Sequence, residues 1–321
     1  MKKNNNNSKN YKVAVIGLGN IGMGYAKKSL IKSHSHSILE HKNFSLEAGI
    51  DKSLKKINLF KKIFKKNSFQ SIKQLEKFKI DVAILSTPEF LHKKNIEEII
   101  KLKSIKMILI EKPCGKNLSE TKEIFQLCKI NSIKLIVNYQ RNYNKKITKI
   151  NKILYNQELK GIFWYSRGLR NNCSHFINFL CNLKLKNLKV KMLDYKKNGN
   201  FMIYNTKCNI FFFKTIEKNK IINECDILTK HYRVMSMNDF NDFKIFKAIK
   251  SRYFNNYYDY NVRPKNLFTN FSKNQLDVLD YIYQVLSKGT KLNKMNKNTL
   301  QTAVLLSDIE KKLKIKNKKL K

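Results

Sequence analysis

The chain has 321 residues, of which 42% are hydrophobic, and its 66 lysines and arginines against 23 aspartates and glutamates give a net charge of +43. That length fits two domains with cores of ordinary size and excludes a single small domain. Only six of the basic residues are arginines, and the lysines are spread through every segment. This pattern indicates a drift of the whole composition, so we expect no nucleic-acid partner from the charge alone.

No targeting segment is evident near the start of the sequence. The first twelve residues hold an asparagine run where a signal peptide needs an apolar core, and no apolar stretch approaches the roughly 18 residues of a membrane span. We therefore expect a cytoplasmic protein with no membrane partner. The six cysteines form no CxxC pair, which predicts free buried thiols and no metal site. His34 and His36 would point to different faces of a helix, and we expect them to be solvated rather than metal ligands.

The first 140 residues alternate short apolar runs with helical patterns. Residues 1–10 form a tail that we expect to be disordered. Strands are predicted at 13–16, 44–50, near 69, 82–86, 107–110 and 134–139. Helices are predicted from the first glycines to about residue 41 and at 71–78, 92–102 and 117–130, the last opening with an N-cap at Asn117. Such alternation predicts a doubly wound parallel sheet of the Rossmann type over residues 11–140.

Beyond residue 140 the pattern changes to several strands in succession with helices at either end. Strands are predicted at 162–165, 189–194, 201–204, 209–214, 221–228 and 232–237. Helices are predicted at 145–155, 172–183, 275–286 and 299–313. The expected fold class is therefore α/β, with an α+β domain over residues 141–321 that contains a largely antiparallel open sheet.

A glycine motif follows the first strand. Gly17, Gly19 and Gly22 have the GxGxxG spacing, in which the first glycine permits a tight turn, the second lets the backbone approach a pyrophosphate and the third allows close helix packing. Asp51 ends the second strand, where a carboxylate accepts from ribose hydroxyls. It lies 29 residues after Gly22, more than the usual ~20. The acid favours NAD over NADP, although Lys52 nearby leaves NADP possible.

Two prolines mark the edge at which an open parallel sheet binds ligands. Pro88 and Pro113 each follow a predicted strand at its carboxyl end. Lys112 lies between such a strand and Pro113. A lysine there is more consistent with a functional group than with one more surface lysine.

These motifs together resemble a known family. The segments VAVIGLGNIG, DVAILSTPEFLH, EKP and NYQRNYN, in this order and with Asp51 ending the second strand, are similar to the Gfo/Idh/MocA family of NAD(P)-dependent oxidoreductases. The first 145 residues carry the resemblance, and the second half follows it more loosely through GIFWYSRGLRNNCSHFINFL. The resemblance implies hydride transfer between nicotinamide and a secondary alcohol of a sugar, sugar nucleotide or cyclitol. It also implies a homodimer or homotetramer formed through the open sheet.

The resemblance assigns roles to particular residues. Lys112 would point at the substrate hydroxyl, and His175 would match the catalytic histidine, because an imidazole suits the proton step and an ammonium stabilises a developing alkoxide. The implied cofactor-binding residues are Gly17, Gly19, Asn20, Ile21, Gly22, Asp51, Ser86, Thr87, Pro88, Glu111 and Lys112. The implied substrate-binding residues are Lys112, Tyr139, Arg141, Arg170, Asn171 and His175.

Two positions depart from the family pattern. Asn171 stands four residues before His175, where many members have an acid, and Asn178 stands where an aspartate is common. An amide accepts a hydrogen bond from an imidazole but brings no negative charge to support an imidazolium. The departure leaves a second function open, that of a non-catalytic NAD-binding sensor or partner subunit with the same fold.

Overall fold

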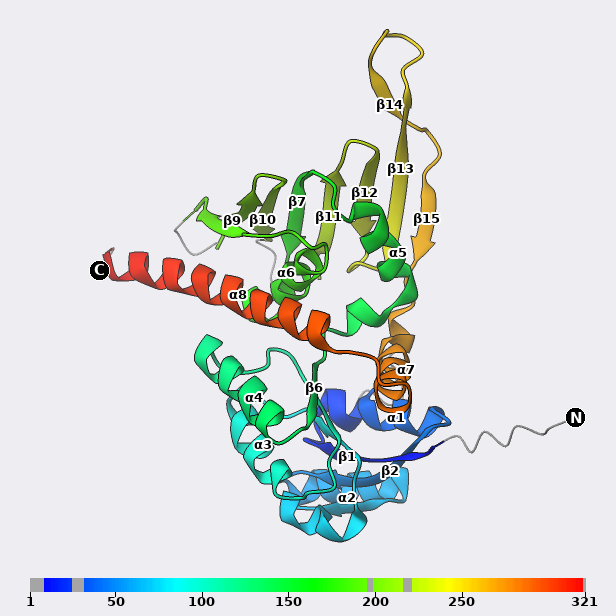
Figure 1. The fold of residues 1–321 in the computed structure, drawn as a ribbon, viewed down its shortest axis with the longest axis vertical. Helices are drawn as coiled ribbons and strands as arrows, with labels where there is room; N and C mark the ends of the chain where they lie inside the picture. Colours follow the sequence, from blue (N-terminus) through cyan, green and yellow to red (C-terminus); the bar gives the residue numbers. More distant parts are fainter. Residues whose placement is uncertain (1–8, 25–31, 195–198, 216–220, 320–321) are drawn as a thin grey trace, which may run out of the picture. The chain divides into compact units, whose positions relative to one another are not determined.

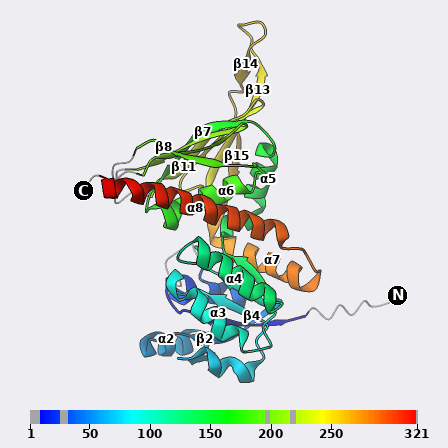
Figure 2. The same ribbon diagram turned by 60° about the vertical axis from the view of Figure 1, so that its left-hand side comes forward.

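The computed structural model of the chain divides into two compact units. Unit 1 contains Met1–Tyr143 and Phe271–Asn296, and unit 2 contains Asn144–Asn270 and Lys297–Lys321 (Figures 1 and 2). The residues that the structure describes are 9–24, 32–194, 199–215 and 221–319.

Unit 1 is built on a six-stranded sheet in which every pair of neighbouring strands is parallel. The strand order is β3-β2-β1-β4-β5-β6, the order of a doubly wound dinucleotide-binding domain. The predicted Rossmann sheet is therefore confirmed. Its strands are β1 (Tyr11–Ile16), β2 (Phe44–Ile50), β3 (Asn67–Phe69), β4 (Val82–Leu85), β5 (Met107–Ile110) and β6 (Lys134–Val137).

Helices cover both faces of this sheet (Figure 1). One face packs against α3 and α4 through Ile96, Ile99 and Ile124, and the other packs against α1, α2 and α7. These helices are α1 (His34–Glu40), α2 (Leu54–Phe64), α3 (His92–Ile100), α4 (Leu118–Ile130) and α7 (Asn274–Ser287). Short turns join them, namely the π-helical η1 (Asn20–Gly24) and the 3-10 turns η2 (Ile72–Phe78), η3 (Glu89–Leu91), η4 (Gln140–Tyr143) and η6 (Phe271–Lys273).

Local signals predicted some of these helices and missed others. The Asn117 N-cap is confirmed, since its side chain accepts from the Glu120 N–H at 2.9 Å. Helix α2 was not predicted, although it buries Ile57, Phe60 and Phe64 at helical spacing. The single long helix predicted after the glycines is instead the turn η1 and the separate helix α1. Residues 25–31 of that prediction, like most of the predicted tail, lie outside the described residues.

Helix α7 returns the chain to unit 1 after the strands of unit 2. Its residues Val278, Ile282 and Val285 are fully buried in the cluster that covers one face of the parallel sheet. Two polar contacts fix the helix: Lys134 Nζ donates to the Val285 carbonyl at 2.9 Å, and His41 Nε2 lies 3.1 Å from Asp280 Oδ1. The apolar face of α7 explains why this segment packs with residues far earlier in the sequence.

Unit 2 contains a largely antiparallel open sheet, as predicted, with one parallel pair formed by β7 and β10. The strand order is β14-β13-β12-β11-β7-β10-β9-β8, and β15 also pairs with β13. The strands are β7 (Leu159–Tyr165), β8 (Lys189–Met192), β9 (Phe201–Asn205), β10 (Cys208–Lys214), β11 (Asn223–Leu228), β12 (Tyr232–Met237), β13 (Asp242–Lys250), β14 (Tyr258–Tyr260) and β15 (Lys265–Phe268). The last three were not predicted.

One face of the unit 2 sheet carries helices (Figures 1 and 2). The rings of Phe163, Phe212 and Phe201 stack along this face with centroids 5.1 Å and 4.7 Å apart. Helix α6 places Phe176 on Phe163 at 5.2 Å. The helices of the unit are α5 (Lys145–Leu154), the π-helical turn η5 (Leu169–Cys173), α6 (Ser174–Cys181) and, from Lys297 onward, α8 (Asn293–Lys319).

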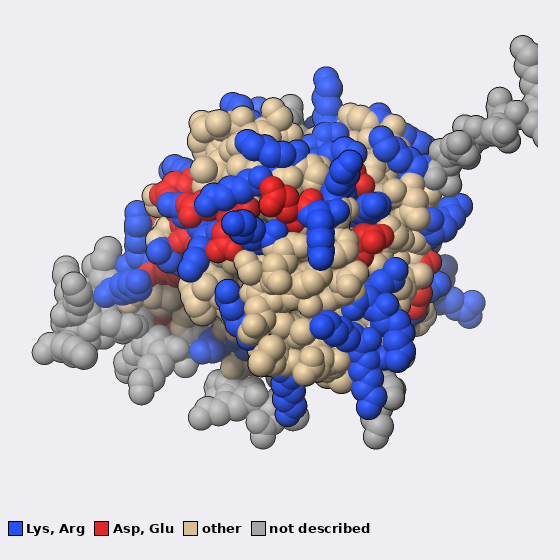
Figure 3. Space-filling model, turned by 90° about the horizontal axis from the view of Figure 1, so that it is seen from below, with Lys and Arg blue, Asp and Glu red and all other residues tan. Residues whose placement is uncertain are grey.

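Among the described residues, no helix combines the length and the apolar character that crossing a membrane requires. On the face drawn in Figure 3, lysines and arginines are spread over the surface with acidic residues and uncharged areas between them. The basic side chains on this face therefore do not form one continuous stripe.

Candidate functional site

The glycine loop Gly17–Gly22 uses its three glycines in different ways. Gly17 has a φ of +95°, and a Cβ there would lie 2.7 Å from the Ser86 carbonyl carbon. A Cβ on Gly22 would lie 2.0 Å from the Gly17 carbonyl oxygen. Gly19 has no atom within 4 Å of its Cβ position. The loop's own fold therefore requires Gly17 and Gly22, whereas at Gly19 the backbone faces open space that a ligand can approach.

Side chains from the neighbouring strands hold this loop in place. Ser86, just after β4, donates from Oγ to the carbonyl of Gly17 at 2.6 Å. Asp51, just after β2, accepts the Leu18 N–H through Oδ2 at 2.8 Å and the Ser53 N–H through Oδ1 at 2.9 Å. Lys56 Nζ lies 3.3 Å from Asp51 Oδ2. Two predicted cofactor-binding residues thus shape the loop from either side.

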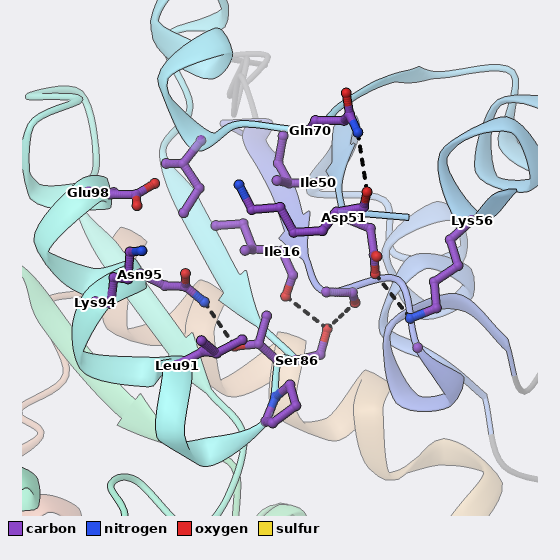
Figure 4. Close-up of a pocket in the computed structure, with 16 residues that line it drawn as sticks. Ile16, Ile50, Asp51, Lys56, Gln70, Ser86, Leu91, Lys94, Asn95 and Glu98 are labelled. Carbon is purple, nitrogen blue, oxygen red and sulfur yellow. Dashed lines mark hydrogen bonds and ion pairs between the residues drawn. The ribbon is translucent and has the colours of Figure 1, made fainter. Parts of the chain in front are cut away.

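A cavity of about 500 Å³ opens at this edge of the sheet (Figure 4). Its volume lies in the usual range for small-ligand pockets. Of the predicted cofactor-binding residues, the cavity lining includes Gly17, Gly19, Asp51, Ser86, Thr87 and Pro88. The other predicted cofactor-binding residues, Asn20, Ile21, Gly22, Glu111 and Lys112, are outside this lining.

Sequence reasoning missed one wall of the cavity. The cavity lining also includes Leu91, the residue before α3, and three residues of α3 itself, Lys94, Asn95 and Glu98. Their i, i+3, i+4, i+7 spacing places them on one helical face, a signal that the sequence contained. Asn95 Nδ2 donates to Thr87 Oγ1 at 3.0 Å, as Figure 4 shows.

The β2 side of the cavity also contributes residues that were not predicted. Lys52, Lys56 and Gln70 line it, and Gln70 Nε2 donates to the Lys52 carbonyl at 3.2 Å (Figure 4). Lys56 lies close enough to Asp51 to form an ion pair. The charge of Asp51 is therefore partly balanced by a cation at the same rim.

The EKP segment lies at the same carboxyl edge, after β5. Lys112 is half-buried, and burial together with the positive charge of Arg141 lowers the pKa of its ammonium, although Glu111 and Glu89 act in the opposite direction. Burial would raise the pKa of Glu111, but hydrogen bonds from His34 and Asn138 and the charge of Lys112 bring it below the ordinary value. A lysine with a lowered pKa beside an ionised carboxylate is suited to proton chemistry.

His34 does not occupy a solvated position, and that expectation was wrong. Its side chain is 2% exposed, and Nε2 lies 2.9 Å from Glu111 Oε1. His36 is half-buried, with Nδ1 2.7 Å from Ser33 Oγ. The partner of His34 lies 77 residues away in the sequence, so local periodicity could not reveal the pair.

Further contacts tie together the loops that follow β4, β5 and β6. The buried His92 ring bridges the carbonyls of Thr87 and Cys114, each at 2.9 Å. Tyr139 is buried, and the Arg141 guanidinium lies over the Phe271 ring at 4.9 Å from its centroid. Of the three residues of this unit that were predicted to bind substrate, Lys112 follows β5, and Tyr139 and Arg141 follow β6.

Unit 2 holds the remaining predicted residues. His175 is half-buried as the second residue of α6, and Asn171 is exposed in the π-helical turn η5, where its Nδ2 donates to the Arg167 carbonyl at 3.4 Å. Arg170 forms an ion pair with Glu310 of α8, with Nε 2.6 Å from Oε1. Asn178 is buried and donates to Thr302 Oγ1 at 2.9 Å.

The backbone is unusual just before the π-helical turn η5, which precedes His175. Arg167 has a φ of +60° and Gly168 a φ of +93°, so two successive residues adopt left-handed conformations before the π-helical turn. Such conformations are costly for a residue with a side chain and are enriched at functional sites.

Cysteine and metal chemistry are not prominent in the described part of the chain. All six cysteines are free and buried, as predicted. Burial raises the pKa of the Cys128 thiol to about 12, and that of Cys225 likewise. Within the described residues, no three His, Cys, Asp or Glu side chains come together in a way that could hold a metal ion.

The strand order, the glycine loop and the strand-end acid define a dinucleotide-binding Rossmann domain. Comparison with known families agrees, because residues 11–139 match the oxidoreductase family with an NAD-binding Rossmann fold, Gfo/Idh/MocA. Residues 11–139 are therefore similar to the NAD-binding Rossmann domain of the Gfo/Idh/MocA oxidoreductases. No curated protein sequence matches the chain.

Solved structures resemble the chain over almost its whole length. The dehydrogenase MviM from Clostridium difficile has 15% identity and a TM-score of 0.75, with 94% of this chain and 99% of that chain covered. The WlbA dehydrogenase from Bordetella pertussis, in complex with NADH and UDP-GlcNAcA, has 13% identity and a TM-score of 0.73, with 96% of each chain covered. The 3-ketoreductase KijD10 from Actinomadura kijaniata, in complex with NADP and TDP-benzene, has 11% identity and a TM-score of 0.72, with 94% and 98% covered. At these identities the likeness concerns the fold.

Proposed function

We propose that the protein transfers a hydride between nicotinamide and a secondary alcohol of a sugar, sugar nucleotide or cyclitol. The observation that carries this proposal is the arrangement of one sheet edge, where a half-buried Lys112 follows β5 and the glycine-loop cavity lies at the ends of β1, β2 and β4. The structurally similar WlbA and KijD10 were solved with UDP-GlcNAcA and TDP-benzene, which supports a sugar nucleotide or its derivative as the substrate class.

The residues of unit 1 fit a dinucleotide. The backbone at Gly19 would approach the pyrophosphate, and Asp51 would accept from the ribose hydroxyls while it keeps its bonds to Leu18 and Ser53. When bound, the nicotinamide supplies the hydride acceptor or donor. Asp51 favours NAD, and Lys52 and Lys56 at the cavity rim leave NADP possible.

Lys112 and His175 have different roles in the proton chemistry of this proposal. The Lys112 ammonium would stabilise negative charge on the substrate oxygen, and the His175 imidazole would take or return the proton. Tyr139, Arg141 and Asn171 would contact the substrate. We expect Arg170 to take part only if its ion pair with Glu310 opens.

The test is the Lys112→Ala variant, with Lys122→Ala as an exposed lysine control. We expect Lys112→Ala to lose turnover by a factor of about 100 or more, with NADH affinity close to that of the wild type in a fluorescence titration. Unchanged turnover in Lys112→Ala would remove this lysine from the mechanism. A folded wild-type protein that binds neither NADH nor NADPH would overturn the whole proposal.

A second function, that of a non-catalytic NAD-binding sensor or partner subunit, is favoured by one observation. Asn171 replaces the acid that many family members carry before the histidine, and its amide donates to the Arg167 carbonyl. This function predicts tight NADH binding without oxidation or reduction of any alcohol or ketone in a broad sugar panel. Turnover of one such compound that depends on Lys112 would exclude it.

We also propose that the protein forms a homodimer or homotetramer through the outer face of the unit 2 sheet. On that face Ile162 lies opposite Phe211, and Trp164, which is 37% exposed, lies opposite Phe213. An apolar face that is partly exposed in this way supports association between copies. Light scattering of the wild type and of Trp164→Lys tests the proposal, and a monomeric wild type would contradict it.

A further inference from the structure

A buried histidine contacts the carboxylate that precedes Lys112 in the sequence. His34 is 2% exposed at the first residue of α1, and its Nε2 lies 2.9 Å from Glu111 Oε1. Glu111 follows directly on β5, at the edge of the sheet where the cofactor cavity lies. The histidine and the EKP segment are therefore joined across two elements that are far apart in the sequence.

Other groups hold the same carboxylate. Asn138, just after β6, donates from Nδ2 to Glu111 Oε1 at 2.7 Å. The same amide nitrogen lies 3.2 Å from Oε1 of Gln275 on α7. Donors from α1 and from the end of β6 thus converge on one oxygen, which fixes the direction of the Glu111 side chain.

Burying this pair costs free energy, and packing alone does not account for its presence. Removing a carboxylate and an imidazole from water is unfavourable, and apolar residues of similar size are often as stable or more stable at such positions. The pair lies next to Lys112, whose other charged neighbours are Arg141 and Glu89. The negative charge of Glu111 raises the pKa of the Lys112 ammonium, whereas the positive charge of Arg141 lowers it. The charge and position of Glu111 therefore influence the protonation of Lys112.

We propose that His34 is a positioning residue: by hydrogen bonding to Glu111 it fixes a negative charge beside Lys112 and so determines the protonation and orientation of the lysine ammonium. The inference rests on the proposed function, in which Lys112 stabilises the substrate oxygen. His34 itself does not touch substrate in this inference and acts only through Glu111.

The variants that test it are His34→Leu, which removes the ring hydrogen bond, and His34→Gln, whose amide nitrogen can replace Nε2 as a donor. The matched control is His36→Leu, because His36 lies on the same helix and contacts Ser33 and Phe64 instead of Glu111. Glu111→Gln is a further variant that keeps the side-chain shape and removes the charge. It covers the case in which His34→Leu does not fold.

The first readout needs no substrate. The pH dependence of acetylation of the Lys112 amine by acetic anhydride, followed by peptide mass spectrometry, reports the midpoint of its titration. Without the hydrogen bond from His34, burial raises the pKa of Glu111, so the carboxylate is protonated more easily and stabilises the ammonium less. We expect the midpoint to fall by about one pH unit in His34→Leu and in Glu111→Gln. It should remain at the wild-type value in His34→Gln and His36→Leu.

The second readout is the pH profile of kcat and KM in the presence of NAD and an active sugar alcohol. An ammonium that stabilises the alkoxide loses its effect as the pH rises through its titration. We expect His34→Leu to move the alkaline decline of kcat to lower pH by about one unit, to lower kcat about tenfold on the alkaline side of that decline and to leave the KM for NAD within about twofold. His34→Gln should restore most of the loss, which a purely structural role for the ring would not predict.

The outcomes separate this inference from the proposed function. An unchanged Lys112 midpoint in folded His34→Leu overturns the inference, and so does an unchanged midpoint in Glu111→Gln. A lowered midpoint in a protein without turnover supports the link from His34 to Lys112 and counts only against the proposed function.

Discussion

Asp51 Oδ2 accepts a hydrogen bond from the backbone N–H of Leu18 at 2.8 Å, which joins the end of β2 to the glycine loop. The carboxylate that would hold a ribose also holds the turn that would hold a pyrophosphate. Its Oδ1 accepts from Ser53 N–H at 2.9 Å, so both oxygens have fixed directions before any ligand binds. Preorganisation of this kind reduces the ordering that binding requires.

The first prediction concerns cofactor choice at Asp51. Asp51→Asn keeps an oxygen that can accept from Leu18 but loses the charge that repels a 2′-phosphate. We expect NADH affinity to fall about tenfold and the ratio of NADPH to NADH affinity to rise, as measured by fluorescence titration. Asp81→Asn is a matched control, because Asp81 also accepts a backbone N–H, that of Lys12, but lies before β4 at the opposite edge of the sheet. An equal loss for NADH and NADPH in Asp51→Asn would contradict the prediction.

The second prediction separates ligand approach from loop geometry. Gly19→Ala adds a methyl group where no protein atom lies within 4 Å, so the free energy of unfolding should change by less than about 0.5 kcal/mol. NADH affinity should fall about tenfold or more, since the methyl group occupies the space of the pyrophosphate. The measurements are urea unfolding and NADH titration on the same preparation.

Gly22→Ala provides the comparison for that experiment. Its methyl group would lie 2.0 Å from the Gly17 carbonyl oxygen, so the loop must move. We expect a loss of about 1–3 kcal/mol in the free energy of unfolding, the usual cost of overpacking. If Gly19→Ala proves the less stable of the two, the distinction drawn between these glycines is wrong.

The sequence predicted the sheet edge well because its signals are local. The glycine spacing, the strand-end Asp51 and the Asn117 cap each occupy a few neighbouring residues, and the structure places them as expected. Helix α2 also had a local signal in the spacing of Ile57, Phe60 and Phe64. The many lysines between those apolar residues obscured it.

Other features depend on contacts between distant residues. His34 is buried because it pairs with Glu111, which lies 77 residues later in the sequence. Helix α7 packs in unit 1 because its apolar face contacts a sheet whose strands come much earlier in the sequence. Asn178 pairs with Thr302 across 124 residues. Periodicity within one window contains no information about such partners, so these positions could be predicted as polar but not as buried and paired.

The third prediction concerns Arg170, which sequence reasoning placed in the substrate site. The side chains of Arg170 and Glu310 are 24% and 29% exposed, and Nε lies 2.6 Å from Oε1. We expect a coupling energy of about 1 kcal/mol for this pair in a double-mutant cycle of Arg170→Ala and Glu310→Ala, measured by urea unfolding. Lys311→Ala, an exposed neighbour of Glu310, should show no coupling to Arg170. A coupling near zero would mean that Arg170 is available for a ligand.

The fourth prediction concerns the pH dependence of stability at Glu111. Hydrogen bonds from His34 and Asn138, together with Lys112, outweigh burial and hold the pKa of this carboxyl below its ordinary value of 4.5. A carboxyl with a lowered pKa contributes stability that is complete above the pKa of the unfolded chain and is lost as the pH falls through the folded pKa. Glu111→Gln lacks that contribution at every pH.

The difference in the free energy of unfolding between wild type and Glu111→Gln should therefore be largest at pH 6 and should shrink between about pH 5 and pH 3. Urea unfolding at several pH values measures it. Glu123→Gln is the control, because Glu123 also has a lowered pKa, caused first by its hydrogen bond from Lys93, but is 46% exposed. Solvent screens an exposed pair, so its removal should change stability less. A difference for Glu111→Gln that stays constant from pH 6 to pH 3 would show that this carboxyl is not held ionised by His34 and Asn138.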